Sequence, residues 1–581
     1  MSPQLVDTQG VRVAIEGCGH GTLDAIYASI AQSCVERGWD TVDVVLIGGD
    51  FQAARNAADL TVMAVPAKYR HLGDFPAYYR GDRTAPYLTL FIGGNHEASA
   101  HLWELYYGGW VCPNIYYLGH AGVVRVGPLR IAGMSGIWKG FDYNRTHFER
   151  LPFSPDDVRS FYHVREVDVR KLLLLRTQVD VGMSHDWPRY IERHGDENHL
   201  FSMKKAFRKE SYDGTLGSPA AAYVMDRLRP HYWFSAHMHC KFSALKTYPP
   251  AAAAQAPAAE TPKAPEPTPS EPQGNPDEID LDMDDEEEQA PATETPKAPE
   301  PAPSVPQGGN PDEIDLDLDD EGPPVKATPS GTSNTDTQGK GTSVPVSLRA
   351  QLPASFAKPN RPDRPERRTP GQPVPPGITN TTVRFLALDK CLPGRHFLQL
   401  CEIQPSEQGQ SSTGAEEPSK ENVEGKEGPR FPLQYDAEWL AITRVFSKYL
   451  TIGDPSATNP PDLGESHYNP LIDAELAWVE ENLVKRGRME VPRNFELTAP
   501  VHVDGMPEST NGQPVEYTHP QTAAFCELLG VPNLWSGTEE EREARRAKGP
   551  APGQQRGRGG RGGGRGGGRG GRGSRGRGGR W

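Results

Sequence analysis

The segment YLTLFIGGNHE (residues 87–97) joins a short apolar run to two glycines and a group of polar side chains. A run of this length, rich in Leu, Ile and Phe and closed by glycine, is typical of a buried β-strand. The glycines allow the backbone to turn sharply and to approach a ligand closely. Asn95 and His96 therefore follow directly on a predicted strand end, which is where α/β proteins bind their ligands.

Four other segments repeat this design of an apolar run followed by a polar side chain that could bind a metal. They are VRVAIEGCGH (11–20), VDVVLIGGD (42–50), VDVGMSHD (179–186) and HYWFSAHMH (231–239). Helical candidates lie between the runs, for example LDAIYASIAQSCVERG (23–38). This alternation predicts an α/β domain with two buried sheets or one large sheet.

The donor atoms at these strand ends suit divalent metal ions. Thiolate, imidazole, carboxylate and amide oxygen together bind borderline cations. A carboxylate that bridges two such ions, for which Asp50 is the best placed candidate, would hold them roughly 3.5–4 Å apart. Each fragment taken alone could be a scattered polar loop, but five fragments of the same design in one domain favour a single metal centre.

The order of these motifs resembles that of the calcineurin-like metallophosphoesterase superfamily, whose pattern is D-x-H, G-D, G-N-H-[DE], H and G-H-x-H. Cys18 stands in place of the first Asp, and Ala236 in place of the Gly before the last His pair. Cysteine at the first position resembles the RNA lariat debranching enzymes. Residues 136–175 resemble the lariat recognition loop of that family, and PQTAAFCELLGVPNLW (520–535) resembles part of its C-terminal domain. The resemblance implies an α/β fold, a two-sheet αββα sandwich, followed by a small α+β C-terminal domain.

The resemblance also implies the roles of individual residues. One metal site would consist of Cys18, His20, Asp50 and His239, and the other of Asp50, Asn95, His185 and His237. His96, next to a ligand, would be the catalytic acid. The soft thiolate favours zinc or iron, with manganese as a substitute. An inert buried thiol is the alternative interpretation of Cys18.

The implied reaction is hydrolysis of the 2′,5′-phosphodiester bond at the branch point of excised intron lariat RNA, which linearises the intron for turnover. Metal-activated hydroxide would attack the phosphorus, with His96 as general acid. Specificity for a branched backbone needs a wall beside the metals, and the insertion at 137–178 carries aromatic and basic residues that suit one. The candidates for substrate binding are Trp138, Lys139, Tyr143, Arg145, Arg150, Arg159, His163 and Arg165. Core packing is the alternative for some aromatic residues of the insertion, Phe161 in particular.

Other functions remain open at this point. Another metallophosphoesterase, either a nuclease or a phosphatase, would normally keep Asp at position 18. A non-catalytic RNA-binding scaffold would be expected to lose metal ligands, yet every ligand position of the family is filled. These alternatives are weaker than a debranching hydrolase, but the residues alone do not exclude them.

The amino-acid composition distinguishes folded from disordered parts of the chain. With 56 Pro, 61 Gly and 36% hydrophobic residues, a large part of the 581-residue chain cannot bury a core. Residues 251–375 have a net charge of -14 and contain a duplicated acidic segment. We therefore predict four parts: a catalytic domain over 1–247, a disordered acidic linker over 248–377, a C-terminal accessory domain over 378–536, and a disordered tail over 537–581 that carries Arg-Gly repeats.

Within the accessory domain, NTTVRFLALDKC (380–391) and HFLQLCEI (396–403) are expected to pair with each other as strands. YDAEWLAITRVFSKYL (435–450) and IDAELAWVEENLVKRG (472–487) have helical spacing. No arrangement typical of a second catalytic site occurs here, so an accessory role is expected.

The partners expected from the sequence are nucleic acids. Residues 556–581 carry nine arginines and no acid, and such Arg-Gly tails bind RNA through charge and guanidinium stacking. The seven cysteines form no CxxC pair, which speaks against a disulfide framework and a zinc knuckle. No apolar run approaches the roughly 20 residues of a membrane span, so no membrane partner is expected in a soluble intracellular protein. The expected substrate implies a nuclear location, with shuttling to the cytoplasm as an alternative.

Overall fold

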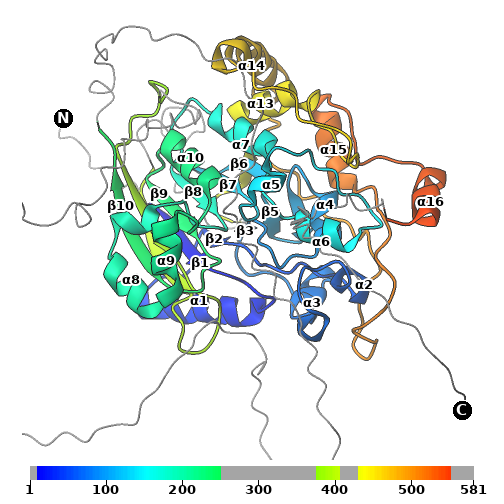
Figure 1. Ribbon diagram of the computed structural model, residues 1–581, viewed down its shortest axis with the longest axis horizontal. Helices are drawn as coiled ribbons and strands as arrows, with labels where there is room; N and C mark the ends of the chain where they lie inside the picture. The colour runs from blue at the N-terminus through cyan, green and yellow to red at the C-terminus, as the bar shows by residue number, and fades with distance from the viewer. Residues whose placement is uncertain (1–9, 250–373, 406–428, 551–581) are drawn as a thin grey trace, which may run out of the picture. The chain divides into compact units, whose positions relative to one another are not determined.

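The computed structural model describes residues 10–249, 374–405 and 429–550. Most of the predicted linker, including its duplication, and all of the Arg-Gly repeats lie outside the described residues. Two β-sheets organise the described part of the chain (Figure 1). No helix within it is both long and apolar enough to cross a membrane.

The first sheet has six strands in the order β12-β1-β2-β3-β5-β4. Its strands are β1 (Val11–Glu16), β2 (Val44–Ile47), β3 (Thr89–Phe91), β4 (Gly109–Cys112), β5 (Ile115–Tyr117) and β12 (Leu398–Ile403). β1, β2 and β3 run parallel. All four residues of β2 are buried, because both faces of this sheet are covered.

The second sheet has seven strands in the order β10-β11-β9-β8-β7-β6-β13. Its strands are β6 (Ala121–Val126), β7 (Leu129–Met134), β8 (Val181–Ser184), β9 (Tyr232–Ser235), β10 (Phe242–Thr247), β11 (Thr382–Ala387) and β13 (Leu433–Tyr435). β7, β8 and β9 run parallel. Each sheet therefore supplies a set of parallel strands whose carboxyl ends can share one rim.

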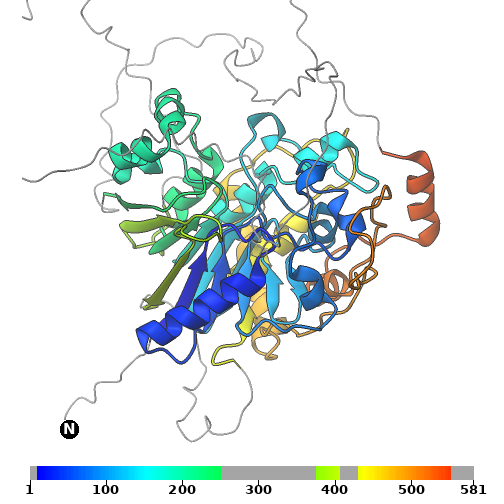
Figure 2. The same ribbon diagram turned by 90° about the horizontal axis from the view of Figure 1, so that it is seen from below.

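Helices cover the outer faces of the two sheets. They are α1 (Leu23–Arg37), α2 (Ala57–Leu60), α3 (Phe75–Tyr79), α4 (Ser99–Glu104), α5 (Gly140–Tyr143), α6 (Pro155–Ser160), α7 (Glu166–Leu173), α8 (Glu197–Met203), α9 (Lys205–Asp213), α10 (Pro219–Leu228), α13 (Ala437–Ser447), α14 (Glu465–Val479), α15 (Pro520–Leu529) and α16 (Glu539–Lys548). Two short 3₁₀-helices are η1 (Ala67–Tyr69) and η2 (Ile191–His194), and the π-helical segment η6 (Glu480–Val484) follows α14. Figure 2 shows α1 along the six-stranded sheet. Alternation along β1 explains this layering: Val13 and Ile15 join the core shared with the second sheet, whereas Ala14 joins the core under α1. The predicted two-sheet α/β sandwich is confirmed.

The expectation that residues 380–391 and 396–403 pair with each other is wrong. β11 lies between β10 and β9 in the second sheet, while β12 pairs antiparallel with β1 at the edge of the first. Each strand has apolar positions, and joining an existing sheet buries them against a core that an isolated hairpin lacks. The C-terminal part of the chain therefore completes both sheets of the N-terminal part.

The predicted tail begins with a helix, so residues 539–548 correct the prediction of disorder from 537 onward. Thr538 and Glu541 form a reciprocal capping box at the start of α16. Acidic side chains fill the first turn and basic ones the last, which suits the helix dipole. Arg545 also forms an ion pair with the buried Glu516, with Nη2 2.8 Å from Oε1. These local contacts stabilise a helix that buries no apolar residue.

Candidate metal centre

Five strand ends converge on one rim between the two sheets. Cys18 and His20 follow β1, Asp50 follows β2 and Asn95 follows β3, whereas His185 follows β8 and the last two histidines follow β9. The turns are tight: Asp50 has a φ of 46° and His237 a φ of 64°, values that non-glycine residues rarely adopt. Such backbone conformations persist at sites where the surrounding structure holds them.

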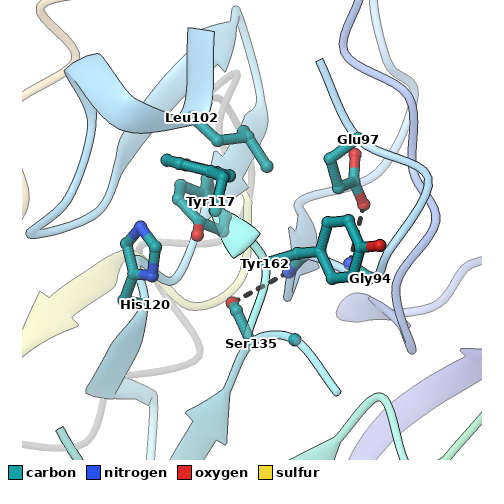
Figure 3. A pocket seen from close by; sticks show the side chains of 10 residues that line it. Gly94, Glu97, Leu102, Tyr117, His120, Ser135 and Tyr162 are labelled. Atoms are coloured by element: carbon teal, nitrogen blue, oxygen red, sulfur yellow. Dashed lines mark hydrogen bonds between the residues drawn. The ribbon is translucent and has the colours of Figure 1, made fainter. Parts of the chain in front are cut away.

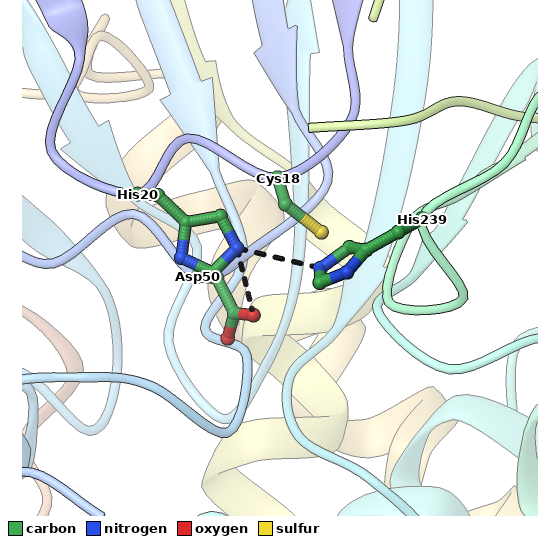
Figure 4. A group of neighbouring side chains, drawn as sticks. All are labelled: Cys18, His20, Asp50 and His239. Atoms are coloured by element: carbon green, nitrogen blue, oxygen red, sulfur yellow. Dashed lines mark hydrogen bonds and ion pairs between the residues drawn. The ribbon is translucent and has the colours of Figure 1, made fainter. Parts of the chain in front are cut away.

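Cys18, His20, Asp50 and His239 form one compact group (Figure 4). Each offers a ligand atom, and these atoms all lie within 4.8 Å of one another. His20 Nε2 lies 3.4 Å from His239 Nε2 and 3.7 Å from Asp50 Oδ2. A thiol, two imidazoles and a carboxylate gathered within this distance are a donor set that suits a borderline divalent metal ion.

Asn95, His185 and His237 lie on the other side of Asp50. His185 Nε2 is 3.2 Å from the amide oxygen of Asn95 and 3.4 Å from Asp50 Oδ1. His185 Nδ1 lies 2.8 Å from the carbonyl oxygen of Gly48. Because a carbonyl only accepts, Nδ1 is the donor, and Nε2 keeps its lone pair for a ligand bond. The ring of His237 lies 4.9 Å from that of His185, measured between centroids.

The electrostatics of these groups fit two bound cations. Asp50 is buried, and its Oδ2 has no hydrogen-bond partner. Burial acts to raise the pKa of Asp50, but His185, His96 and His20 hold it well below its usual value, so the carboxylate stays charged. Burial lowers the pKa of His237 to about 3 and that of His239 to about 2, which keeps both imidazoles neutral. A buried charge with an unused oxygen beside neutral imidazoles is the environment that a metal ion completes.

Cys18 is fully buried, and its Sγ accepts a hydrogen bond from the backbone N–H of His237 at 3.2 Å. Burial, reinforced by the charge of Asp50, raises the pKa of the Cys18 thiol well above its usual value. A thiol in this position ionises only when a cation takes the place of its proton, as in metal sites where binding releases protons.

His96 lies beside Asp50 and is partly exposed, as are His20, Asn95, His237 and His239 among the predicted ligands. Its side chain is 32% exposed, and its Nδ1 lies 3.4 Å from Asp50 Oδ2. Its backbone N–H donates to Asp50 Oδ1 at 2.8 Å. The imidazole is therefore anchored at the centre while part of it stays open to solvent, as a group that exchanges protons with a substrate must be.

Glu97 is a supporting residue that the sequence reasoning missed. Its carboxylate accepts from the backbone N–H groups of Phe51, Gln52 and Gly94 at 2.8–2.9 Å. These bonds join the loop after β2 to the loop after β3. Burial, reinforced by Asp50, raises the pKa of Glu97 to about 8. Its position within the GNHE motif was the one available signal.

The segment after β11, which belongs to the C-terminal part of the chain, contacts the loop that carries Cys18. The N–H of Cys18 donates to the carbonyl of Asp389 at 3.4 Å. A Cβ at Gly17 would lie 2.0 Å from that same oxygen, so only glycine allows this approach. Sequence reasoning could not find this contact, because nothing in the local pattern links positions more than 370 residues apart.

The insertion at 137–178 contains both accessible and buried candidates. Lys139 and Arg159 are exposed, and Trp138 and Tyr143 are half-buried with their rings 4.7 Å apart. These four side chains are at least partly accessible to solvent. Phe161 packs in the core, as its alternative interpretation expects.

The other four candidates already have protein partners. Arg145 and His163 bind the carboxylate of Asp142, at 3.0 and 2.7 Å. Arg150 Nη2 lies 2.7 Å from Oε1 of Glu516. Arg165 is fully buried, where it pairs with Glu149 and donates to the carbonyl of Ser160 at 2.9 Å. Arg165 and His163 therefore hold the insertion together in this structure.

A second group of potential ligands, His120, His147 and Asp168, is buried beside the insertion. His147 Nε2 lies 2.7 Å from Asp168 Oδ2, and Lys171 Nζ lies 3.2 Å from Asp168 Oδ1. The ammonium group of Lys171 already neutralises the carboxylate and would repel a cation. We therefore interpret this group as a buried ion-pair network.

Two cavities of the described residues differ in size and place. Behind the loop after β3, Glu97 and His120 line a cavity of about 10 Å³, room for about one water molecule (Figure 3). A hollow of about 570 Å³ is lined by Val42 and Leu88, which precede β2 and β3. It therefore lies at the opposite ends of the strands from the metal centre.

Comparisons with known proteins agree with this architecture. Residues 11–241 match the family model described as calcineurin-like phosphoesterase, and residues 380–534 match that described as lariat debranching enzyme, C-terminal domain. The lariat debranching enzyme of Homo sapiens is 34% identical over 534 residues, which cover 92% of this chain and 71% of the relative. That of Schizosaccharomyces pombe is 36% identical over 521 residues, 90% of this chain and 96% of the relative. That of Arabidopsis thaliana is 33% identical over 531 residues, 90% and 87% of the two chains.

Proposed function

Because the chain belongs to the lariat debranching enzyme family, we propose that the metal centre described above carries the family's reaction and that individual residues have the roles given below. The chain is a metallophosphoesterase-type hydrolase that cleaves the branch-point 2′,5′-phosphodiester of intron lariats. The observation that carries the assignment is the group of Cys18, His20, Asp50 and His239, whose ligand atoms lie within 4.8 Å of one another.

The proposed metal sites share Asp50. Cys18, His20 and His239 complete one of them, and Asn95, His185 and His237 complete the other. The contacts of Asp50 support a bridging role, since its two oxygens face histidines of both groups at 3.4–3.7 Å. The thiol supports zinc or iron in its site, with manganese as a substitute.

His96 is the proposed general acid. When bound, the two cations neutralise the charge of the phosphate and supply hydroxide at neutral pH. The 2′-oxygen of the branch nucleotide then leaves, and an alkoxide is a poor leaving group unless it receives a proton. The protonated imidazole of His96 can give that proton and become neutral imidazole, because it is partly exposed beside Asp50. The products are a linear intron with a free 2′-hydroxyl and a 5′-phosphate.

The insertion at 137–178 is the proposed wall that selects a branched backbone. The backbone N–H of Trp138, next to Lys139, donates to Asp186 Oδ2 at 3.3 Å, and Asp186 directly follows the predicted ligand His185. Trp138 and Tyr143 offer aromatic faces, and Arg159 offers an exposed cation. Stacking on a splayed base together with cations near phosphates can distinguish a branch from a linear strand.

The remaining parts of the proposal rest on sequence. The ranges matched by the family models support a catalytic domain over 1–247 and an accessory domain over 378–536. The Arg-Gly repeats add RNA affinity without sequence specificity. A nuclear location is proposed because the substrate is an excised intron.

The reaction is tested by incubating the full chain with a branched RNA and with a linear RNA of the same sequence. We expect cleavage of the branched RNA alone, giving a product with a free 2′-hydroxyl and a 5′-phosphate. A chelated sample is the matched control and should leave both RNAs intact. Cleavage of both RNAs at similar rates would instead indicate a general nuclease.

A further inference from the structure

Gln52 contacts the metal centre from outside the set of predicted ligands. The nitrogen of its side-chain amide lies 3.2 Å from Nδ1 of His20. The other ring nitrogen of His20, Nε2, is directed at His239 and Asp50, 3.4 Å from His239 Nε2 and 3.7 Å from Asp50 Oδ2 (Figure 4). The amide of Gln52 therefore contacts the side of the His20 ring that is turned away from the other ligands.

The backbone around Gln52 holds this side chain in place. Gln52 has a φ of 64°, a left-handed conformation that is uncommon for a residue other than glycine. Its backbone N–H donates to Glu97 Oε2 at 2.9 Å, and its carbonyl accepts from the N–H of Ala54 at 2.8 Å. A left-handed conformation that the surrounding structure fixes in this way is a feature of functional sites.

The contact bears on which nitrogen of His20 can bind a metal ion. In a neutral imidazole, one nitrogen carries the proton and the other has a free lone pair. A metal ion beside Asp50 and His239 needs the lone pair of Nε2, so the proton must lie on Nδ1 and must find an acceptor. Gln52 supplies that acceptor when its amide oxygen faces Nδ1, because a half-turn of the planar amide exchanges its oxygen and its nitrogen.

His185, in the other proposed metal site, has the same arrangement with a different partner. Its Nδ1 donates to the carbonyl of Gly48 at 2.8 Å. A carbonyl only accepts, whereas the side-chain amide of a glutamine can either donate or accept. The backbone therefore fixes the tautomer of His185, while the tautomer of His20 depends on the orientation of one side chain.

We propose that Gln52 is a positioning residue of the metal site that contains Cys18, here called the Cys18 site, and this rests on the proposed function. The amide oxygen of Gln52 accepts from the Nδ1–H of His20, which leaves Nε2 unprotonated and directed at the metal ion. Loss of such a partner typically lowers metal affinity about 10–100-fold. Gln52 thereby sets how tightly the Cys18 site binds its ion.

The test titrates cobalt(II) into the chelated full chain and follows the charge-transfer absorption of a cobalt–thiolate bond. Among the described residues, Cys18 is the one cysteine in a group that could hold a metal ion, so this absorption reports the Cys18 site. Gln52→Leu should raise the dissociation constant of that site about 10–100-fold, because Nδ1 of His20 loses its acceptor. Binding at the site that contains His185, measured as the remaining bound cobalt, should stay as in wild type.

Gln52→Glu tests the direction of the hydrogen bond. A carboxylate of the same reach only accepts, so this variant should bind cobalt at the Cys18 site at least as tightly as wild type. Gln52→Asp carries the same charge on a side chain one methylene shorter, and it should bind more weakly than Gln52→Glu. If Gln52→Leu does not fold, Gln52→Gly replaces it, because glycine adopts a φ of 64° without strain.

The matched control is Gln434→Leu, at a half-buried glutamine of β13, which lies at the edge of the second sheet. It should leave both sites unchanged. The proposal would be overturned by an unchanged affinity in Gln52→Leu, by an equal loss at both sites, or by a Gln52→Glu variant as weak as Gln52→Leu. A wild-type chain that shows no cobalt–thiolate absorption would instead contradict the proposed function, since Cys18 would then not be a ligand.

Discussion

Replacing His96 by alanine is expected to lower kcat on branched RNA by about 10²–10⁴-fold, the usual contribution of a general acid. Metal content and branched-RNA binding should stay close to wild type. The reason is structural: the link from position 96 to Asp50 Oδ1 is made by the backbone N–H, which alanine keeps. His71→Ala, at an exposed position in the loop before α3, is the matched control and should have no effect.

A modified substrate separates proton donation from other roles of His96. If sulfur replaces the 2′-oxygen at the branch, the leaving group is a thiolate, which needs no proton because its pKa is far below that of an alcohol. His96→Ala should then lose much less activity than it loses on the natural linkage. Loss of metal in the variant, or the same loss on both substrates, would mean that His96 has another role.

Replacing Cys18 by aspartate should make activity depend on which metal is supplied. The carboxylate is a harder ligand, so activity with manganese relative to zinc or iron should rise at least about tenfold. Two ions should still bind, since Asp at this position fits the wider phosphoesterase pattern. The measurement is metal content together with activity in chelated protein to which single metals are returned.

The matched control for this variant is Cys112→Asp. Cys112 is also fully buried, but it lies in β4, away from the predicted ligands. An unpaired carboxylate there should lower the melting temperature and leave the metal preference unchanged. If Cys18→Asp behaves like this control, Cys18 is an inert buried thiol and the ligand assignment is wrong.

The strand ends could be predicted because each is a local pattern. An apolar run, a glycine turn and a polar residue lie within about ten positions, and β1, β2, β3, β8 and β9 all appear where these patterns stand. The convergence of their ends followed from the geometry of parallel strands. The closeness of Cys18, His20, Asp50 and His239 in space could accordingly be predicted from the sequence, and their role as ligands stays a prediction.

What could not be predicted depends on contacts between distant segments. β11 and β12 have the apolar pattern of strands, but which sheet each joins depends on edges built by residues 11–247. From the sequence, Gly17 is interpreted as a turn residue, and only the structure shows that the backbone of Asp389 leaves no room for a side chain there. From the sequence, Arg165 is a candidate for RNA binding, but in the structure its guanidinium group pairs with Glu149 and donates to the carbonyl of Ser160. Whether a charged side chain is buried cannot be predicted from the local sequence, because its partners come from other segments of the chain.

The most direct test of the two-metal centre is a titration of divalent metal into the chelated full chain, with cleavage of the 2′,5′ bond of a branched RNA as the readout. If the seven predicted ligands hold two ions that act together, activity should be absent without metal and should reach its maximum only at two ions per chain. Full activity at one ion per chain, or cleavage that persists without metal, would contradict the account.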